Sequence, residues 1–446
     1  MTEQERIALI VIYIIIFTIE AIFLLAKKKE KGHYCYKGIV FAFLFLYDVI
    51  PLIILWNIGI FKEEATQTNM QYLYEKDFWS YMYSILITIL GLISFHIAYS
   101  FFEKKRNRMT LYEIEKERKV KLLKIITWLT FSIGAISLLV FCQSFGGITT
   151  ALKYAEVMRG FSSTYKINYW ASILIIPARL VTVSPFLFIM LNSKEKINKK
   201  KIMYAIFCVI SFLLSIVYFL VNAGKAPILM FGLCFIYAIL KLFTKKTWTI
   251  IIILGMLSIP LLGVLDSTFL YLANGKFEMK DVSYYKYITQ FTYPVRNTLN
   301  VADIVNKYGY RYGTDYITGT LNIFPKVNFK ASYEDTSEFY GGQDWKKKGG
   351  VPNDFITFSY LQLGVCGVII LSALIGVLLE AIDARTILLK KNFSDYLLCG
   401  ALMVYSYSII LNADPEPVIK GNMIYFLLIF VIIYTMRREK GKRKKI

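Results

Sequence analysis

Eleven apolar segments divide the chain, and each has nearly the ~20 residues that a helix needs to cross the hydrocarbon core of a bilayer. They fall roughly at 6–26, 39–61, 79–101, 121–142, 170–191, 202–221, 225–243, 248–272, 353–379, 396–412 and 421–436. The mean hydropathy of +0.51 and the hydrophobic content of 56% are far above those of soluble proteins. The sequence therefore predicts an all-α, polytopic integral membrane protein with about 11 transmembrane helices. We expect residues 1–446 to form a single membrane domain.

Positive charge alternates between the two sides of these segments. Of the 52 Lys and Arg residues, 31 lie in 27–38, 103–121, 192–201, 241–247, 381–395 and the tail 436–446. Only 8 lie in 1–6, 62–78, 143–169, 222–225 and 413–420. Because short cytoplasmic loops collect Lys and Arg, this pattern predicts an N-terminus outside and a C-terminus inside. It makes 143–169 an external loop, and 273–352 a large external loop between the eighth and ninth helices.

Composition also excludes several classes of function. The net charge is +21, but most basic residues sit at cytoplasmic membrane ends, where anionic lipid attracts them. We therefore expect membrane lipid as a partner and no nucleic acid. The six cysteines show no paired spacing, and both histidines, His33 and His96, are predicted on or near the cytoplasmic side. With no Walker or glycine-rich nucleotide motif either, the sequence predicts no cofactor and no metal.

The two external loops have different patterns. In 143–169, apolar residues recur at helical spacing from Ile148 to Met158 or Arg159, which suits a helix lying on the membrane surface. In the longer loop, 284–306 reads as an amphipathic helix with Val295 and Leu299 on its apolar stripe. A glycine- and aromatic-rich piece follows at 308–316, and then a short apolar stretch at 317–325. We expect the remainder, 327–352, to be polar and flexible.

Arg179 is the most unusual residue of the predicted membrane segments. It lies nine positions into the fifth one, about 13 Å deep at ~1.5 Å per residue. Insertion scales put the cost of an arginine at the bilayer centre at about 2.5–3.5 kcal/mol, so it needs a partner or a polar cavity. Pro177 and Pro185 flank it and are expected to break the helix locally. A salt bridge to Asp48 and a functional role are compatible, and both stay open.

Lys225 opens the seventh segment after the tight turn 222–227. Pro227 fits the first turn of a helix, where its missing N–H costs little. A lysine beside the free N–H groups of a helix N-terminus favours an anion, phosphate above all. An ordinary interfacial lysine explains the same residue equally well.

The long external loop supplies further charged and aromatic candidates. Its main cations are Arg296, Arg311 and Lys326, and the candidate carboxylates are Asp315, Glu334 and Glu338, with Asp414 in the last external turn. Tyr310 and Tyr312 flank Arg311, and aromatic faces suit the apolar faces of sugar rings. Tyrosines also belong at membrane interfaces in general. Asp414 and Glu416 could hold a cation or act as a base, but two carboxylates alone are poor evidence for a metal.

Four short motifs make the chain similar to the O-antigen polymerase (Wzy) family of oligosaccharide repeat-unit polymerases. They are the turn Gly224-Lys225, the sequence Ile323-Phe-Pro-Lys326, the passage from Asn353 to Gly367 with its Gly-x-x-Gly pair, and Arg179 in the helix after the first long external loop. The architecture with a large external loop in the C-terminal half resembles the family over nearly the whole length. The chain departs from it in having Lys rather than Arg at 225 and no Pro after Lys326.

The resemblance implies a glycosyltransferase of the bacterial cytoplasmic (inner) membrane. Such enzymes transfer a growing glycan from undecaprenyl pyrophosphate onto a new lipid-linked repeat unit at the external face, during O-antigen or capsule synthesis. A flippase and a chain-length regulator are the implied partner proteins. An O-antigen ligase and a flippase of lipid-linked oligosaccharide are the alternatives. The ligase is less favoured because the resemblance implies an external histidine for ligases, and a flippase would more often show a two-fold repeat of helices.

Chemistry of this kind develops negative charge on the leaving pyrophosphate, and a preplaced cation in a dry site contributes about 3–4 kcal/mol. The sequence-based hypothesis is a clamp of Arg179, Lys225 and either Arg296 or Arg311. The general base is left open among Glu334, Glu338, Asp315 and Asp414. The expected substrate-binding residues are Arg159, Tyr310, Tyr312, Asp315, Lys326 and Asp414.

Overall fold

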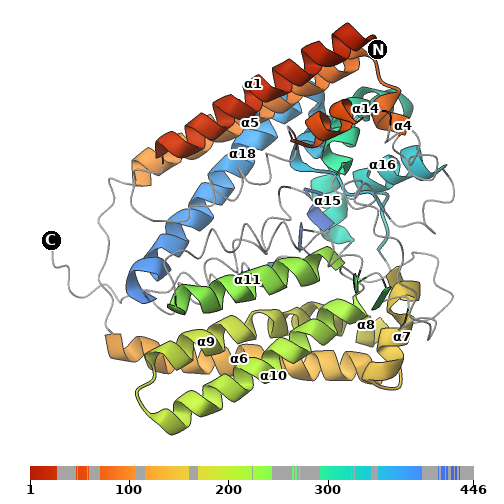
Figure 1. Cartoon of the computed structure of the whole chain (residues 1–446). Coiled ribbons are helices and arrows are strands. Elements are labelled where there is room, and N and C mark those ends of the chain that lie inside the picture. The colour runs from red at the N-terminus through yellow and green to blue at the C-terminus, as the bar shows by residue number, and fades with distance from the viewer. Residues whose placement is uncertain are drawn as a thin grey trace. The chain divides into compact units, whose positions relative to one another are not determined.

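The computed structural model describes most of the chain. The described stretches are 1–27, 49–57, 71–106, 116–159, 169–222, 225–243, 292–322, 327–342 and 350–393, with isolated residues at 47, 59, 264–271, 324 and 410–431. Every regular element in these stretches is helical, as the sequence predicts (Figure 1).

Five helices in the described stretches are long and apolar enough to cross a membrane. They cover Phe78–Phe102, Lys121–Gln143, Ile173–Ser193, Asn198–Val221 and Phe355–Ala381. Each coincides with one of the predicted segments. The chain is therefore a multi-pass helical membrane protein. Helices also cover the first and seventh predicted segments, as α1 (Glu3–Lys27) and α11 (Lys225–Phe243).

The remaining helices follow in chain order. They are α4 (Gln71–Tyr74), α5 (Phe78–Arg106), α6 (Lys116–Gln143), α7 (Ile148–Arg159), α8 (Tyr169–Ala178), the 3-10 helix η2 (Arg179–Thr182), α9 (Ser184–Lys194), α10 (Asn198–Val221), α14 (Tyr293–Tyr308), α15 (Thr314–Leu321), α16 (Ser332–Gly341) and α18 (Phe355–Phe393).

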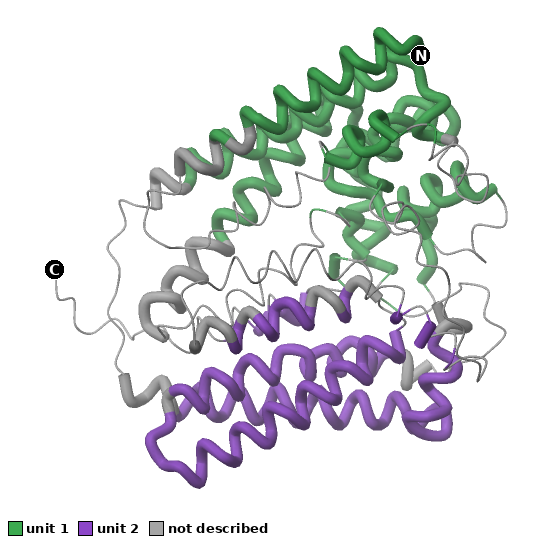
Figure 2. Tube along the Cα trace, in the orientation of Figure 1, with its two compact units in different colours: residues 1–108, 283–384, 407–420 green, residues 109–282, 385–406, 421–446 purple. Residues whose placement is uncertain are grey.

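The chain divides into two compact units, each built from stretches far apart in the sequence (Figure 2). Unit 1 comprises 1–108, 283–384 and 407–420, and unit 2 comprises 109–282, 385–406 and 421–446. The chain crosses between them several times, so neither unit is a separate segment of sequence. A single membrane domain stays a prediction.

Aromatic side chains form much of the core of unit 2. Trp128 of α6 lies edge-on to Phe207 of α10, with ring centroids 4.6 Å apart. Such edge-to-face pairs are worth about 0.5–1.5 kcal/mol beyond their buried area. Helix α7 buries Ala151 and Ala155 in the same core. The predicted helix of the first external loop is therefore present, and its small-residue face packs into unit 2.

The break predicted around Arg179 is present in unit 2. Helix α8 contains Pro177, the 3-10 helix η2 follows, and α9 carries a proline in its first turn. Backbone N–H groups at the break donate to the carbonyls of Leu180 and Val181, and hydroxyl groups add further hydrogen bonds to carbonyls there. The donors are Thr182 Oγ1 to Arg179 O (2.8 Å), Ser184 Oγ to Leu180 O (3.1 Å) and Ser215 Oγ to Val181 O (3.0 Å).

In unit 1, helix α14 packs against α5. It belongs to 273–352, the loop that the sequence predicts to be external, and the described part of this loop is named the external segment. Val295 and Leu299 are buried in a core shared with α1 and α5, as the predicted stripe requires. Ser84 of α5 and Thr298 of α14 share a hydrogen bond of 2.7 Å. Residues 284–291 of the predicted helix lie outside the described stretches.

A second helix break lies in α18 and was not predicted. Leu363 (φ −144°, ψ 23°) and Gly364 (φ 63°, ψ −147°) leave the helical conformation. All eight residues from 355 to 362 are buried, whereas large apolar side chains become exposed from Leu363 onward. Backbone N–H groups of Arg311 and Tyr312 donate to the carbonyls of Leu361 and Gln362, both at 2.9 Å. The external segment therefore repairs this break.

The prediction that 327–352 is polar and flexible is wrong for 332–341, where helix α16 forms. Glu334 Oε1 accepts the N–H of Ala331 at 3.3 Å, which helps to fix the start of the helix. Its buried face contains Ser332, Asp335, Thr336 and Ser337. Sequence periodicity did not reveal this helix because its inner face is polar.

Candidate functional site in the external segment

A buried polar cluster joins α16, the start of α18 and the turn at 413–416. Ser332 Oγ donates to Asp414 Oδ1 at 2.6 Å, and the backbone N–H of Asn353 donates to Asp414 Oδ2 at 3.4 Å. Thr336 Oγ1 donates to Asn353 Oδ1 at 2.8 Å. Asp414 is 1% exposed, and Ser332, Asn353 and Thr336 are at most 1% exposed. The predicted carboxylate of the last external turn thus lies inside the folded external segment.

Burial raises the pKa of Asp414 from its ordinary value of 3.8 to about 7. The hydrogen bond from Ser332 opposes this shift, and the negative charge of Asp315 adds to it. A carboxyl group with a pKa near 7 is suited to accept or release a proton at neutral pH.

Asp315 lies on α15 and pairs with the end of the buried half of α18. Gln362 Nε2 donates to Asp315 Oδ2 at 2.7 Å. Asp315 is 1% exposed and Gln362 is fully buried. Helix α15 also packs closely on the turn, since a Cβ at Gly319 would lie 3.2 Å from the backbone nitrogen of Glu416. Asp315 and Asp414, both predicted to bind substrate, are therefore brought into one region.

Arg311 is engaged in an ion cluster with α16. Its guanidinium donates to Asp335, and Lys330 Nζ bridges Asp335 Oδ1 at 2.9 Å and Glu338 Oε2 at 2.8 Å. The guanidinium also donates to the carbonyl of Lys330 at 3.2 Å. Arg311 and Glu338, both predicted to be catalytic, are thus each paired with an opposite charge.

Arg296 has a different environment on α14. Its guanidinium lies 4.1 Å from the centroid of the Tyr340 ring, and the Tyr340 hydroxyl donates to its backbone carbonyl at 3.0 Å. Its Nε is enclosed, and no described group accepts from it. Burial lowers the pKa of Arg296, but an arginine remains charged in proteins. No carboxylate in the described stretches forms an ion pair with it.

Tyrosines line the side of this region next to the break in α18. The rings of Tyr310 and Tyr312 lie 6.0 Å apart, and those of Tyr310 and Tyr360 lie 6.3 Å apart. The Tyr360 hydroxyl shares a hydrogen bond of 2.7 Å with Tyr83. Tyr312 is 72% exposed and Tyr310 38%. The two tyrosines predicted to face a sugar are therefore accessible.

Arg179 lies in unit 2, at the break between α8 and α9. Its Nε donates to the Tyr425 hydroxyl at 3.1 Å, and Thr182 Oγ1 lies 2.7 Å from the same hydroxyl. The guanidinium also lies 5.2 Å from the centre of the Tyr425 ring. Asp48, the predicted salt-bridge partner, is outside the described residues.

For the remaining predicted cations, the structure describes the backbone alone or nothing. Arg159 ends α7 and Lys225 begins α11, as its turn predicts, but their side chains lie outside the described part, as does all of Lys326. Arg179 and Lys225 belong to unit 2, whereas Arg296 and Arg311 belong to unit 1. A clamp that combines them stays a prediction.

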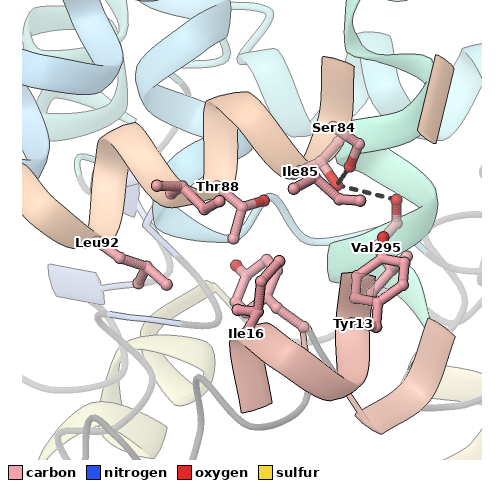
Figure 3. Close-up of a pocket in the computed structure, with 10 residues that line it drawn as sticks. Tyr13, Ile16, Ser84, Ile85, Thr88, Leu92 and Val295 are labelled. Carbon is pink, nitrogen blue, oxygen red and sulfur yellow. Dashed lines mark hydrogen bonds between the residues drawn. The ribbon is translucent and has the colours of Figure 1, made fainter. Parts of the chain in front are cut away.

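A small cavity in unit 1 lies between α1, α5 and α14, lined by Tyr13, Ser84, Thr88, Thr298 and apolar neighbours (Figure 3). Its volume of about 10 Å³ is at the lower limit for one water molecule. It is too small for a sugar, so we do not assign the substrate to it.

Sequence reasoning missed the neutral members of the polar cluster, above all Ser332, Thr336 and Gln362. Asn353 lies in a quoted motif, but nothing there indicated that its side chain would reach Asp414. Such residues carry no charge pattern, and only the fold brings them together. In the described stretches, no group of three or more His, Cys, Asp or Glu has a metal-binding arrangement.

Comparison of the chain with family models, curated proteins and solved structures finds no match. The resemblance to the O-antigen polymerase family therefore rests on the sequence motifs alone.

Proposed function

We propose that this chain is a polymerase of undecaprenyl-pyrophosphate-linked oligosaccharide repeat units in the bacterial cytoplasmic membrane, with 11 spans, an external N-terminus and a cytoplasmic C-terminus. The observation that carries the proposal is the folded external segment, which holds cations, carboxylates and exposed tyrosines against a broken membrane helix. A lipid-linked pyrophosphate sugar has its charged and glycan parts at the level proposed for this segment, just outside the apolar core of the membrane. The motif resemblance and the lack of any nucleotide motif support the same reading.

Arg296 is better suited than Arg311 to bind the leaving pyrophosphate. Arg311 already faces Asp335, so its charge is largely compensated. The guanidinium of Arg296 lies against the Tyr340 ring and forms no ion pair with a described carboxylate, which leaves its positive charge uncompensated for an anion. An arginine presents its donors in a fork that matches phosphate oxygens. Arg179 and Lys225 remain proposed members of the clamp.

Asp414 is the proposed general base among the four carboxylates. Glu338 is paired with Lys330, and Glu334 accepts a backbone N–H at the start of α16. Burial raises the pKa of Asp414 to about 7. It is enclosed in this structure, so a sugar hydroxyl reaches it only if the 413–416 turn moves away from α16.

Arg159, Lys326 and the tyrosines complete the proposal as glycan-binding groups. Tyr310 and Tyr312 lie close enough to offer two neighbouring aromatic surfaces to a chain of sugars. Asp315 follows Tyr312 by three residues and belongs to the same external segment.

The decisive experiment follows surface and lipid-linked glycan in cells that lack the chain. Single repeat units at the surface, or held on lipid outside, are expected for a polymerase. Full-length polymer left on its carrier would instead establish a ligase. An unchanged glycan would refute the proposal.

Complementation then tests Arg296. We expect Arg296→Ala to reduce polymer at least tenfold, because one cation at a dry site contributes about 3–4 kcal/mol. Lys307→Ala on the same helix α14 is the matched control, since Lys307 is an exposed cation, and it should leave polymer length unchanged. Equal polymer in well-expressed wild type and Arg296→Ala would remove Arg296 from the proposed clamp.

A flippase is the second candidate, and the broken helix α18 favours it, because transporters often build substrate sites from discontinuous helices. In that case the deletion would trap repeat units on the inner leaflet. Repeat units delivered to the outer leaflet would exclude the flippase.

A further inference from the structure

Two buried oxygen atoms at the junction of α15 and α18 lack partners. Gln362 uses its Nε2 to donate to Asp315 Oδ2 at 2.7 Å. The other oxygens of the pair, Asp315 Oδ1 and Gln362 Oε1, are enclosed, and no described donor reaches either. Both residues are at most 1% exposed. A buried acceptor without a partner is costly, so the two oxygens of this one residue pair call for a donor or a cation beside them.

Two negative groups lie near this pair, although Asp315 itself stands in the first turn of α15, at the positive end of that helix. Gln362 is the last helical residue before the break at Leu363 and Gly364, so the partial negative charge of a helix C-terminus lies beside it. The carboxylate of Asp414 is close enough to interact electrostatically with Asp315. Among the described residues no lysine or arginine forms an ion pair with Asp315 or Asp414, and Arg311 is committed to Asp335.

We propose that Asp315 Oδ1 and Gln362 Oε1 bind a hard divalent cation, Ca²⁺ or Mg²⁺, at the end of the buried half of α18. The ligand set contains only oxygen, which calcium and magnesium prefer. Magnesium in particular is commonly held by one or two carboxylates and keeps several waters. With Asp414 as a second nearby carboxylate, the local charge matches a divalent ion better than a monovalent one.

The proposal explains how α15 is fixed to the broken helix. One ion would satisfy both unpartnered oxygens and offset two buried carboxylates. It would join α15, the buried half of α18 and, through the field of Asp414, the 413–416 turn. The inference does not depend on the polymerase proposal, because it concerns the folded external segment alone.

Thermal unfolding of the purified full-length protein in detergent tests this directly. The probes are Ca²⁺, Mg²⁺ or Mn²⁺ alone at fixed pH, each compared with EDTA. We expect saturating metal to raise the midpoint temperature by several degrees, because a ligand that binds only the folded state stabilises it. Bound Mn²⁺, followed by electron paramagnetic resonance, should reach a single tight equivalent. An equal midpoint in EDTA and in all three metals would overturn the proposal and would favour a proton between the two oxygens.

Two variants and one control sharpen the test. Asp315→Asn keeps the size of the side chain and removes its charge, so the metal-induced shift should be lost. Gln362→Glu adds a charge to the same position and should lower the metal concentration needed for half of the shift at least tenfold. Asp303→Asn changes a half-exposed carboxylate on α14 that pairs with Lys76, and the shift should persist. If Asp315→Asn fails to fold, Gln362→Glu still decides, since an unchanged metal requirement there contradicts the proposal.

Discussion

The two helix breaks differ in what repairs them. In unit 2, the break around Arg179 is closed within the helix bundle by local backbone N–H groups and by the hydroxyls of Thr182, Ser184 and Ser215. In unit 1, the break at Leu363–Gly364 is closed by backbone N–H groups of Arg311 and Tyr312, from the external segment. A membrane helix can be interrupted only where other groups take over its hydrogen bonds. The first break is thus a property of the bundle, whereas the second ties the membrane helix to the external polar site.

Each break also requires a close backbone approach at a glycine. A Cβ at Gly367 would lie 2.2 Å from the carbonyl oxygen of Ser359, and a Cβ at Gly134 would lie 2.5 Å from the backbone nitrogen of Val181. Both neighbours are backbone atoms, so they cannot move aside as a flexible side chain can. The two glycines mark the tightest contacts of the two breaks.

The largest predicted effect comes from filling these contacts. We expect Gly367→Ala and Gly134→Ala each to cost about 3 kcal/mol or more, at the upper end of the effects of overpacking. The measurement is the midpoint of thermal unfolding in detergent, with glycan polymerisation as a second readout. Gly232→Ala in α11 is the control, because nothing lies within 4 Å of its added Cβ, and alanine favours helix by about 1 kcal/mol. Near-wild-type midpoints for both variants would mean that neither close approach is needed.

The sequence predicted one break and missed the other for a physical reason. Pro177 and Pro185 remove backbone donors, which is visible in any sequence. The break in α18 has no proline, and two N–H groups from about 50 residues away in the chain satisfy its carbonyls. Gly364 and Gly367 appear in the sequence only as a spaced pair. The same limit applies to the site, where charged residues were predicted but their pairing was not.

Protonation of Asp414 should next distinguish unit 1, which contains this residue, from unit 2. Its pKa is about 7 in the folded chain and near 3.8 ordinarily, so between these values the folded chain holds a proton that the unfolded chain has lost. Stability should therefore fall as the pH rises from about 4 to about 7, and level off above 7. At about 1.4 kcal/mol per unit of pKa shift, the shift of roughly 3 units corresponds to about 4 kcal/mol.

The measurement is unfolding in EDTA across this pH range. Asp414→Asn should flatten the slope, because its amide oxygen can still accept from Ser332 but no longer titrates. Asp303→Asn, at a surface ion pair of α14, should keep the slope of the wild type. An unchanged slope in Asp414→Asn would assign the pH dependence to other groups.

Removing a hydroxyl tests the break in unit 2. Ser215 is fully buried and donates to the carbonyls of Val181 and Ser211. Ser215→Ala leaves the Val181 carbonyl without this donor, and we expect a loss of about 1–2 kcal/mol. Ser193→Ala, which removes a local hydrogen bond to Met190 near the end of α9, should cost less. If the loss were equal in both, the hydroxyl at the break would have no special role.

The smallest predicted effect concerns Tyr312, at the contact of the external segment with α18. Tyr312 has a positive φ of 50°, which is unfavourable for a tyrosine and well tolerated by asparagine. Its ring is 72% exposed, so Tyr312→Asn should raise stability by up to about 1 kcal/mol. Tyr310→Asn should lower stability instead, because Tyr310 packs on Tyr360 and lies close to Gly364. If Tyr312→Asn is more stable but makes shorter glycan, the strained tyrosine is kept for binding sugar. A more stable variant with unchanged glycan would leave the second break as a purely structural joint.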